Sequence, residues 1–190
     1  MIISTHYRLS MSNDSHIRDL IMRLARLDAT QGWGGDLNPT QRAMLGYLGQ
    51  ANRFSRSPSH VADYLGTTRG TATQSLKSLQ QKGYVTERRS EVDKRVISYE
   101  LTDAGQSVTS TAALLETAIS KMEATQKQAV ERILQDVLVG VLAANKGRAF
   151  GLCKTCKHHQ DTKGAPRCGL LNVALTREEV GQICHEQVSA

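Results

Sequence analysis

The residues best able to do chemistry in this 190-residue chain are its four cysteines, which all lie in its last fifth. They form one CxxC pair followed by gaps of eleven and fifteen residues: Cys153, Cys156, Cys168 and Cys184. The thiolates of a CxxC pair can reach a single metal centre, and soft sulfur ligands favour zinc and iron–sulfur clusters. The pattern therefore predicts that these four cysteines ligate a metal centre.

The spacing also bears on the kind of centre. Structural zinc sites with four cysteines usually contain two CxxC pairs, and this chain has one. Iron–sulfur clusters accept four thiolates at uneven spacing, so such a cluster is favoured, with 4Fe–4S ahead of 2Fe–2S. Zinc stays open, also with mixed ligands, because His158, His159 and His185 lie in the same region. Redox thiols or disulfides are a third alternative, and they are less favoured in a cytoplasmic protein.

Composition narrows the class of partner and the location. The net charge is +6, which makes a polyanion a plausible partner. No apolar run approaches the roughly 20 residues that span a bilayer. The first residues lack the apolar core of a signal peptide. We therefore expect a cytoplasmic protein that does not enter the membrane.

Apolar residues at helical spacing predict four helices before residue 83. The first covers about residues 17–27. The second begins at Asn38-Pro39, where Asn38 and Gln41 match a capping box. Ser57-Pro58 begins a short third helix, Gly66 allows a tight turn, and a fourth helix ends near Gly83.

Two short helices joined by a glycine turn indicate a helix-turn-helix. The outer face of its second helix carries side chains able to contact bases or phosphates in a major groove. These candidate DNA-binding residues are Thr68, Arg69, Thr71, Thr73, Gln74 and Lys77. The alternative is an ordinary solvated helix face.

A polar turn lies between two segments typical of antiparallel strands, residues 84–89 and 96–101. Its cations Lys94 and Arg95 would lie along the DNA backbone or in a minor groove. The alternative is a solvated hairpin tip. The expected fold is mainly α with a small β-wing: a winged helix-turn-helix, a helical dimerisation domain and a small C-terminal metal module.

At this point the chain resembles the MarR family of bacterial transcriptional regulators. The resemblance covers about residues 13–145 and is carried by Leu37-Asn38-Pro39-Thr40-Gln41, the helix pair 57–82, Lys82-Gly83-Tyr84-Val85, Asp93-Lys94-Arg95 and Leu101-Thr102-Asp103-Ala104-Gly105. It implies that the Asp-x-Arg pattern of Asp93 and Arg95 positions an arginine for the minor groove. It also implies an obligate homodimer. The cysteine-rich extension departs from the family pattern, and the peroxide-reactive N-terminal cysteine of some members has no counterpart here.

Two apolar stripes support a dimer independently. One runs from Val108 to Met122 and the other from Val130 to Leu142, and the second is too apolar for a helix with one buried edge. A two-fold dimer would place two recognition helices about one DNA turn apart on a pseudo-palindromic double-stranded operator. Simple packing within one chain is the alternative.

These observations divide the chain into three parts. They are a flexible leader 1–12, a MarR-like region 13–146 with its DNA-binding core at about 38–105, and a metal module 147–190. In the module, Thr176 and Glu179 match a capping box, which predicts a helix that also carries Ile183 and Cys184.

The favoured function is a dimeric, sequence-specific DNA-binding regulator whose cysteine-ligated cluster senses iron, oxygen or redox state. The alternative is a MarR-type regulator with a structural zinc module and a small-molecule effector at the dimer interface. An enzyme is disfavoured, because the chain shows no nucleotide-binding loop, catalytic His/Asp/Ser pattern or cofactor fingerprint.

Overall fold

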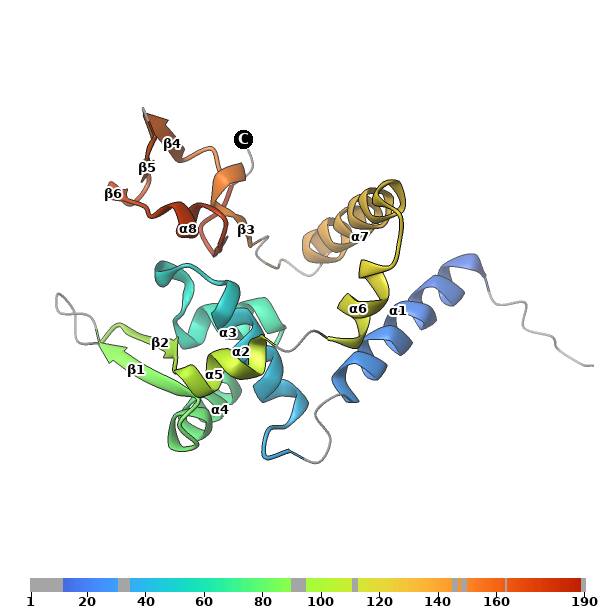
Figure 1. Cartoon of the computed structure of the whole chain (residues 1–190), viewed down its shortest axis with the longest axis horizontal. Helices are drawn as coiled ribbons and strands as arrows, with labels where there is room; N and C mark the ends of the chain where they lie inside the picture. Colours follow the sequence, from blue (N-terminus) through green and yellow to red (C-terminus); the bar gives the residue numbers. More distant parts are fainter. Residues whose placement is uncertain are drawn as a thin grey trace, which may run out of the picture.

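The structure is a computed structural model that describes residues 12–30, 35–89, 95–110, 113–144, 147, 150–162 and 164–188. Figure 1 shows a winged helix, a helical arm and a C-terminal module that lies above the winged helix. The helices are α1 (Asn13–Ala29), α2 (Pro39–Gln50), α3 (Pro58–Leu65), α4 (Arg69–Gln81), α5 (Asp103–Thr109), α6 (Leu114–Ser120), α7 (Ala124–Ala144) and α8 (Arg177–Val180), with 3-10 turns η2 (Arg53–Ser55) and η3 (Cys153–Thr155). The strands are β1 (Val85–Arg89), β2 (Ile97–Leu101), β3 (Gly151–Leu152), β4 (His159–Thr162), β5 (Ala165–Cys168), β6 (Val173–Ala174) and β7 (Ile183–Cys184).

The helix starts predicted from capping residues are confirmed. The Asn38 side chain accepts a hydrogen bond from the backbone N–H of Gln41 at 2.8 Å, and the Gln41 side chain accepts one from the backbone N–H of Asn38. Ser57 caps α3, Thr68 caps α4, and Gly66 between them has a φ of 62°. Side chains outside the helices thus satisfy the orphan N–H groups at the helix starts, and glycine supplies the left-handed turn.

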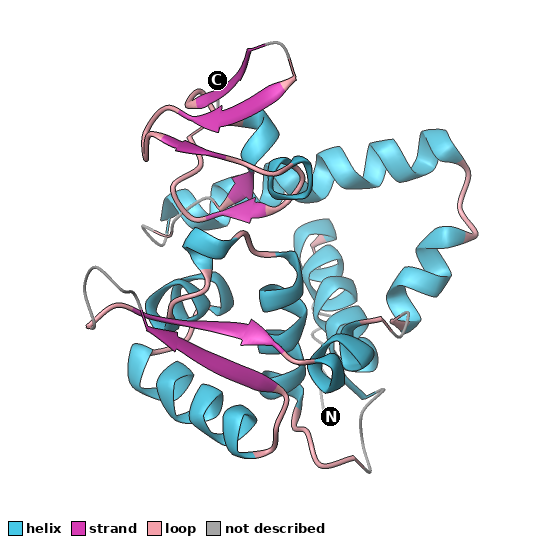
Figure 2. Cartoon of the chain, turned by 60° about the vertical axis from the view of Figure 1, so that its left-hand side comes forward, coloured by secondary structure: helices cyan, strands magenta, loops and turns pink. Residues whose placement is uncertain are grey.

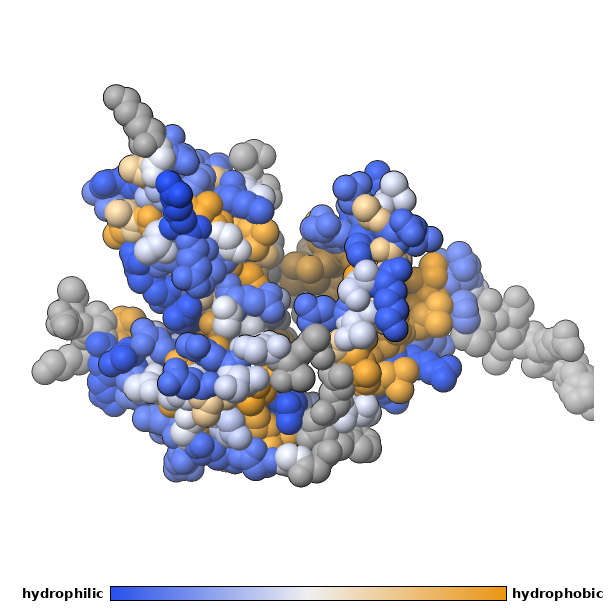
Figure 3. All heavy atoms as spheres, in the orientation of Figure 1, coloured by the Kyte–Doolittle hydropathy of each residue, from blue (hydrophilic) through white to orange (hydrophobic). Residues whose placement is uncertain are grey.

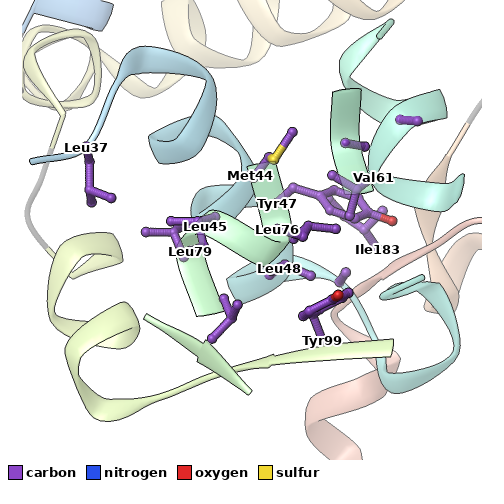
Figure 4. Close-up of a cluster of buried hydrophobic side chains, with 14 residues drawn as sticks. Leu37, Met44, Leu45, Tyr47, Leu48, Val61, Leu76, Leu79, Tyr99 and Ile183 are labelled. Carbon is purple, nitrogen blue, oxygen red and sulfur yellow. The ribbon is translucent and has the colours of Figure 1, made fainter. Parts of the chain in front are cut away.

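The core of the winged helix forms where α2, α3 and α4 pack against the wing strands. Met44, Leu45, Val61, Leu76 and Leu79 have no exposed surface. Ile183, from the C-terminal module, belongs to the same cluster; in Figure 4 it lies among the side chains of α2 and α3. The apolar positions at helical spacing therefore do face one core, and the module contributes to it.

The wing is an antiparallel pair in which Val85 lies opposite Leu101 and Arg89 lies opposite Ile97. The strand that the sequence placed at residues 84–89 begins at Val85. Gly83, with a φ of 80°, turns the chain from α4 into β1. Tyr99 in β2 is 1% exposed, and its backbone N–H donates to the carbonyl of Arg56 at 3.0 Å. This bond ties the wing to the segment before α3.

The apolar stripe from Val108 to Met122 falls on two helices, α5 and α6, instead of one. The hydroxyls of Thr109 and Ser110 both donate to the carbonyl of Gln106, each at 2.9 Å. Hydroxyl side chains that bond to the preceding turn compete with the helical backbone. The run of hydroxyl residues therefore ends α5 where the spacing alone predicted continuity.

Apolar side chains stay exposed along the helical arm, which consists of α1, α6 and α7. Orange residues gather over α1 and α6 in Figure 3. Leu20 is 47% exposed, Leu27 51%, Ile133 55% and Val141 58%, and α1, α6 and α7 have no buried residues. A helix with such a stripe requires a partner surface. In the part of the chain that the structure describes, no helix combines the length and the apolar character of a membrane span.

The C-terminal module consists of short strands around α8, seen above the winged helix in Figure 2. Strands β3 and β7 pair antiparallel, with Gly151 opposite Cys184. Strands β4, β5 and β6 form a second antiparallel sheet, with His159 opposite Cys168. Long-range pairing of small strands, more than helix formation, therefore shapes this module.

We expect Gly105→Ala to lower the free energy of unfolding by about 1–3 kcal/mol, because an added methyl group overpacks a filled site. A Cβ at this position would overlap the backbone carbonyl oxygen of Tyr84 and contact Leu101 at 3.2 Å. Gly46→Ala is the matched control, since its Cβ would meet nothing within 4 Å. In the interior of α2 that change should be neutral or stabilising by about 0.5–1 kcal/mol. Urea denaturation measures both, and equal stability of the two variants would contradict the packing argument.

Candidate nucleic-acid interface and candidate metal centre

The outer face of α4 presents the predicted polar side chains to solvent. Arg69, Gln74 and Lys77 are exposed, and their side chains make no hydrogen bond or ion pair with other described residues. Together with Gly70 and Thr73 they line a shallow hollow of about 460 Å³. The arrangement leaves one amide and two cationic groups available along one helix face. Such groups can donate to base edges and phosphates.

The hydroxyls on this face are partly used within the protein. The Thr68 oxygen accepts from the backbone N–H of Thr71 at 3.1 Å and lies 2.8 Å from the Thr71 hydroxyl. The Thr73 hydroxyl donates to the carbonyl of Arg69 at 2.7 Å. These threonines therefore fix the start of α4, and their oxygens retain acceptor capacity on its outer face.

The wing carries further exposed cations. Arg95 is exposed just before β2, whereas Asp93 and Lys94 lie outside the described residues. Sequence reasoning did not single out Arg88 and Arg89, which are exposed on β1. Arg88 pairs with Glu100 at 3.0 Å, and Arg89 pairs with Glu87 at 2.9 Å. These ion pairs partly neutralise the charge of Arg88 and Arg89. Of the described wing cations, Arg95 is the one that the sequence predicted.

The strands of the C-terminal module bring the four cysteines together. Cys153 follows β3, and its backbone N–H donates to the carbonyl of Gln182, which is one residue before β7 and two residues before Cys184. Cys156 closes the CxxC turn by donating its backbone N–H to the carbonyl of Cys153 at 3.1 Å. The β4–β5 pairing then returns Cys168 beside the end of that turn. The CxxC pair therefore forms a turn, and the two longer sequence gaps contain the chain that leads to the paired strands of Cys168 and Cys184.

All four cysteines carry free thiols, and Cys153, Cys156 and Cys184 are buried whereas Cys168 is partly exposed. In the described ranges, no three His, Cys, Asp or Glu side chains already converge on a point that would hold a single metal ion. The thiols are therefore neighbours in one small module and not a closed tetrahedron around one ion.

Cys184 does not come from a helix, and in this respect the sequence prediction is wrong. The capping box of Thr176 and Glu179 is present, with bonds of 2.8 and 3.1 Å, but α8 ends at Val180. Gly181 follows, and Cys184 lies in β7. Cys168 also lies in a strand, β5. Pairing of β7 with β3 overrides the helical spacing, and Gly181 was the available stop signal.

Burial, and after it the neighbouring Cys184, Cys168, Cys156 and Glu179 in that order, together raise the pKa of the Cys153 thiol from 9.0 to about 11. A buried site with several acidic neighbours disfavours the negative charge of a thiolate. Without a cation, Cys153 is therefore protonated at neutral pH. A metal cation would supply the charge that favours the thiolate.

In the metal-free chain we expect Cys153 to be alkylated slowly at pH 8, with a rate that rises about tenfold per pH unit up to about pH 11. The partly exposed Cys168 should react first. The raised pKa also stabilises the fold below pH 9, and this contribution is lost as the pH rises through 11. Iodoacetamide labelling with peptide mass spectrometry measures the rates. A plateau of the Cys153 rate already at pH 9 would contradict the assignment.

The wing and the helix pair match a known family. Residues 35–96, about a third of the chain, match the MarR family, and the match ends before the four cysteines. Members of this family are DNA-binding transcription factors and not enzymes, which agrees with the expectation that the chain is not an enzyme. No curated protein was found to match the chain.

Solved structures share the fold. FabT of Streptococcus pneumoniae in complex with DNA is 23% identical, with a TM-score of 0.56 over 69% of this chain and 96% of that chain. MepR of S. aureus in a DNA complex is 17% identical, with a TM-score of 0.54 over 68% and 98%. A MarR transcriptional regulator from Methanosarcina mazei Go1 is 21% identical, with a TM-score of 0.54 over 68% and 98%. The chain therefore has the fold of a MarR-type winged helix.

Proposed function

We propose that this chain, whose winged helix matches the MarR family, is a dimeric, sequence-specific DNA-binding transcriptional regulator. We further propose that its four C-terminal cysteines hold an iron–sulfur cluster, with 4Fe–4S favoured, that reports iron supply, oxygen or redox state. The observation that carries the proposal is that one chain combines an exposed polar face on α4 with four neighbouring thiols in a module that shares its core.

DNA binding is supported by the chemistry of the α4 face and by the net charge of +6. Arg69, Gln74 and Lys77 would enter a major groove, and Arg95 would contact the backbone or the minor groove. FabT and MepR, which share the fold, were solved as complexes with DNA. These observations together favour double-stranded DNA over other polyanions.

A homodimer is supported by the exposed apolar face of the helical arm. A second copy of the chain would bury α1, α6 and α7, whose leucine, isoleucine and valine side chains are about half exposed in one chain. Burying one such side chain fully contributes roughly 1.5–3 kcal/mol, so a dozen partly buried ones suffice for stable association. A two-fold dimer would then recognise a pseudo-palindromic operator.

The choice of cluster over zinc rests on the single CxxC pair and the uneven spacing of the other two cysteines. Burial of Cys153, Cys156 and Cys184 would exclude water from most of the centre, and four thiolates can fill its coordination. Free thiols suit a reducing compartment, so we place the protein in the cytoplasm. The alternative is a structural zinc module with a small-molecule effector at the dimer interface.

Anaerobic purification followed by visible absorption and iron, sulfide and zinc analysis tests the metal. Brown protein with about four irons and four sulfides per chain supports the proposal. Colourless protein with one zinc per chain supports the alternative. Comparing the operator affinity of the metal-loaded and the metal-free dimer at one salt concentration then tests sensing. Equal affinities would leave the metal centre with a structural role only.

We expect Arg95→Ala to weaken binding to operator and to unrelated DNA alike, by about tenfold, and to lower the slope of log affinity against log salt by about one. A cation that contacts phosphate or the minor groove releases a counterion but carries little sequence information. Lys121→Ala removes the same charge at the end of α6 and serves as the control. An unchanged salt slope would argue against the wing contact.

A further inference from the structure

The segment that carries Cys184 is part of both the cysteine module and the winged helix. Ile183, the preceding residue, is 9% exposed and belongs to the core that contains Tyr47, Leu48 and Val61 (Figure 4). The carbonyl of Ile183 accepts a hydrogen bond from the backbone N–H of Asn52 at 2.9 Å, and Ile183 forms a parallel β-bridge with Ala51. One neighbour of Cys184 is therefore fixed at the end of α2.

The other neighbour, His185, is fixed to the start of the helix-turn-helix. Its backbone N–H donates to the hydroxyl oxygen of Ser55 at 3.0 Å, and its Nδ1 lies 3.3 Å from the same oxygen. The His185 ring stacks on the ring of His60, with centroids 3.5 Å apart and 24° between the planes. Ser55 is fully buried in η2, and His60 is in the first turns of α3.

Two further contacts join the module to the winged helix. Arg53 pairs with Glu179 of α8 at 2.5 Å and donates to the carbonyl of Ala174 at 3.0 Å. Phe150, at the entrance to β3, lies edge-on to Tyr47 and Tyr64, with centroids 6.1 and 5.3 Å away. By contrast, α7, which leads into the module, has no buried residue in the single chain. These contacts join the module to α2, η2 and α3 of the winged helix.

We propose that Cys184 transmits the state of the metal centre to the DNA-reading helices within one chain, through Ile183, His185, Ser55 and His60. The proposal rests on the function proposed above and names the route of its regulation. Binding of Cys184 to a metal fixes its position, and the residues on either side of it hold η2 and α3. Since α3 packs against α4, a shift of this segment changes how α4 is presented to DNA.

This route differs from control through the dimerising helix. A ligand shifts a two-state equilibrium only through a difference in its interaction with the two states. Here the two states differ in how firmly the Cys184 segment is held against η2 and α3. In the loaded state the metal also fixes Cys184, and in the metal-free state only the contacts described above hold the segment. Coupling between two sites is reciprocal, so operator binding must also change the affinity of the chain for its metal.

Ser55→Ala in the full-length dimer tests the route, because it removes the hydroxyl that contacts His185 and touches neither the cysteines nor the face of α4. The measured quantity is the ratio of operator affinities of loaded and metal-free protein at fixed salt. Coupled sites typically give a ratio of about 5–150. We expect Ser55→Ala to keep its metal and to bring the ratio several-fold closer to one. The control Ser110→Ala, which loses a hydroxyl at the C-cap of α5, should keep the wild-type ratio.

The outcomes separate this proposal from the one on which it rests. A wild-type ratio of one would end the sensing function, and the route with it. A wild-type ratio well above one that Ser55→Ala leaves unchanged would keep the sensor and overturn the route. If Ser55→Ala fails to fold or loses its metal, the route is tested instead by amide hydrogen exchange of the wild-type dimer in its metal-loaded and metal-free forms. Residues 51–66 should then be better protected in the loaded form, and equal protection overturns the route.

Discussion

Cys168→Ser is expected to remove the metal from the purified protein while the winged helix stays folded. Loss of one of four thiolate ligands leaves an open coordination position and weakens retention of a cluster or zinc ion strongly. We expect metal per chain to fall to less than about a tenth of the wild-type value. Cys168 lies in β5 and is partly exposed, and no residue of β5 belongs to the main core. The free energy of unfolding of the winged helix should therefore change by less than about 1 kcal/mol.

Metal analysis after anaerobic purification, combined with urea denaturation followed by circular dichroism, measures both parts of this expectation. Lys154→Ala is the control, because it changes an exposed residue inside the CxxC turn and removes no ligand. Full metal content in Cys168→Ser would exclude this cysteine from the ligand set. Global unfolding would show instead that the sheet of β4, β5 and β6 supports the main core.

The winged helix could be predicted in detail because its signals are local. Asn38, Ser57 and Gly66 mark helix ends by chemistry that acts within a few residues. The buried positions of α4, Ala72, Leu76 and Leu79, follow from helical spacing alone. Each of these interactions can be recognised inside one short window of sequence.

The module could not be predicted in the same way, because distant segments determine it. Ile183 enters the core by pairing beside Ala51, which precedes it by more than 100 residues in the sequence. The spacing of Val180 and Ile183 fits a helix, but Ile183 instead pairs with Leu152 in an antiparallel sheet. The CxxC spacing grouped two cysteines correctly, whereas the position of Cys168 beside that pair depends on the β4–β5 register. A sequence window cannot show such a register.

Simultaneous replacement of Arg69, Gln74 and Lys77 by alanine is expected to lower operator affinity by about 1,000-fold or more, to the level of unrelated DNA. Specific complexes exceed non-specific ones by about 10³–10⁷, and base-edge contacts supply much of that difference. These three side chains project from one face of α4 and make no hydrogen bond or ion pair with other described residues. Their loss therefore removes the candidate contacts to bases and phosphates while the buried positions stay intact.

Fluorescence anisotropy with operator and scrambled duplexes at two salt concentrations measures the effect. The fold should be unaffected, because alanine has the highest helix propensity and all three positions are outside the core. A triple variant on α7, with Lys127, Glu131 and Gln135 replaced by alanine, leaves the net charge unchanged and tests for an effect of truncating exposed polar side chains outside α4. The loss of two cations should also weaken binding to scrambled DNA, but by a smaller factor than binding to operator, because Arg95 is retained and no base contact is lost there. If operator and scrambled DNA lose affinity equally, α4 contacts only the backbone and sequence must be recognised by another element.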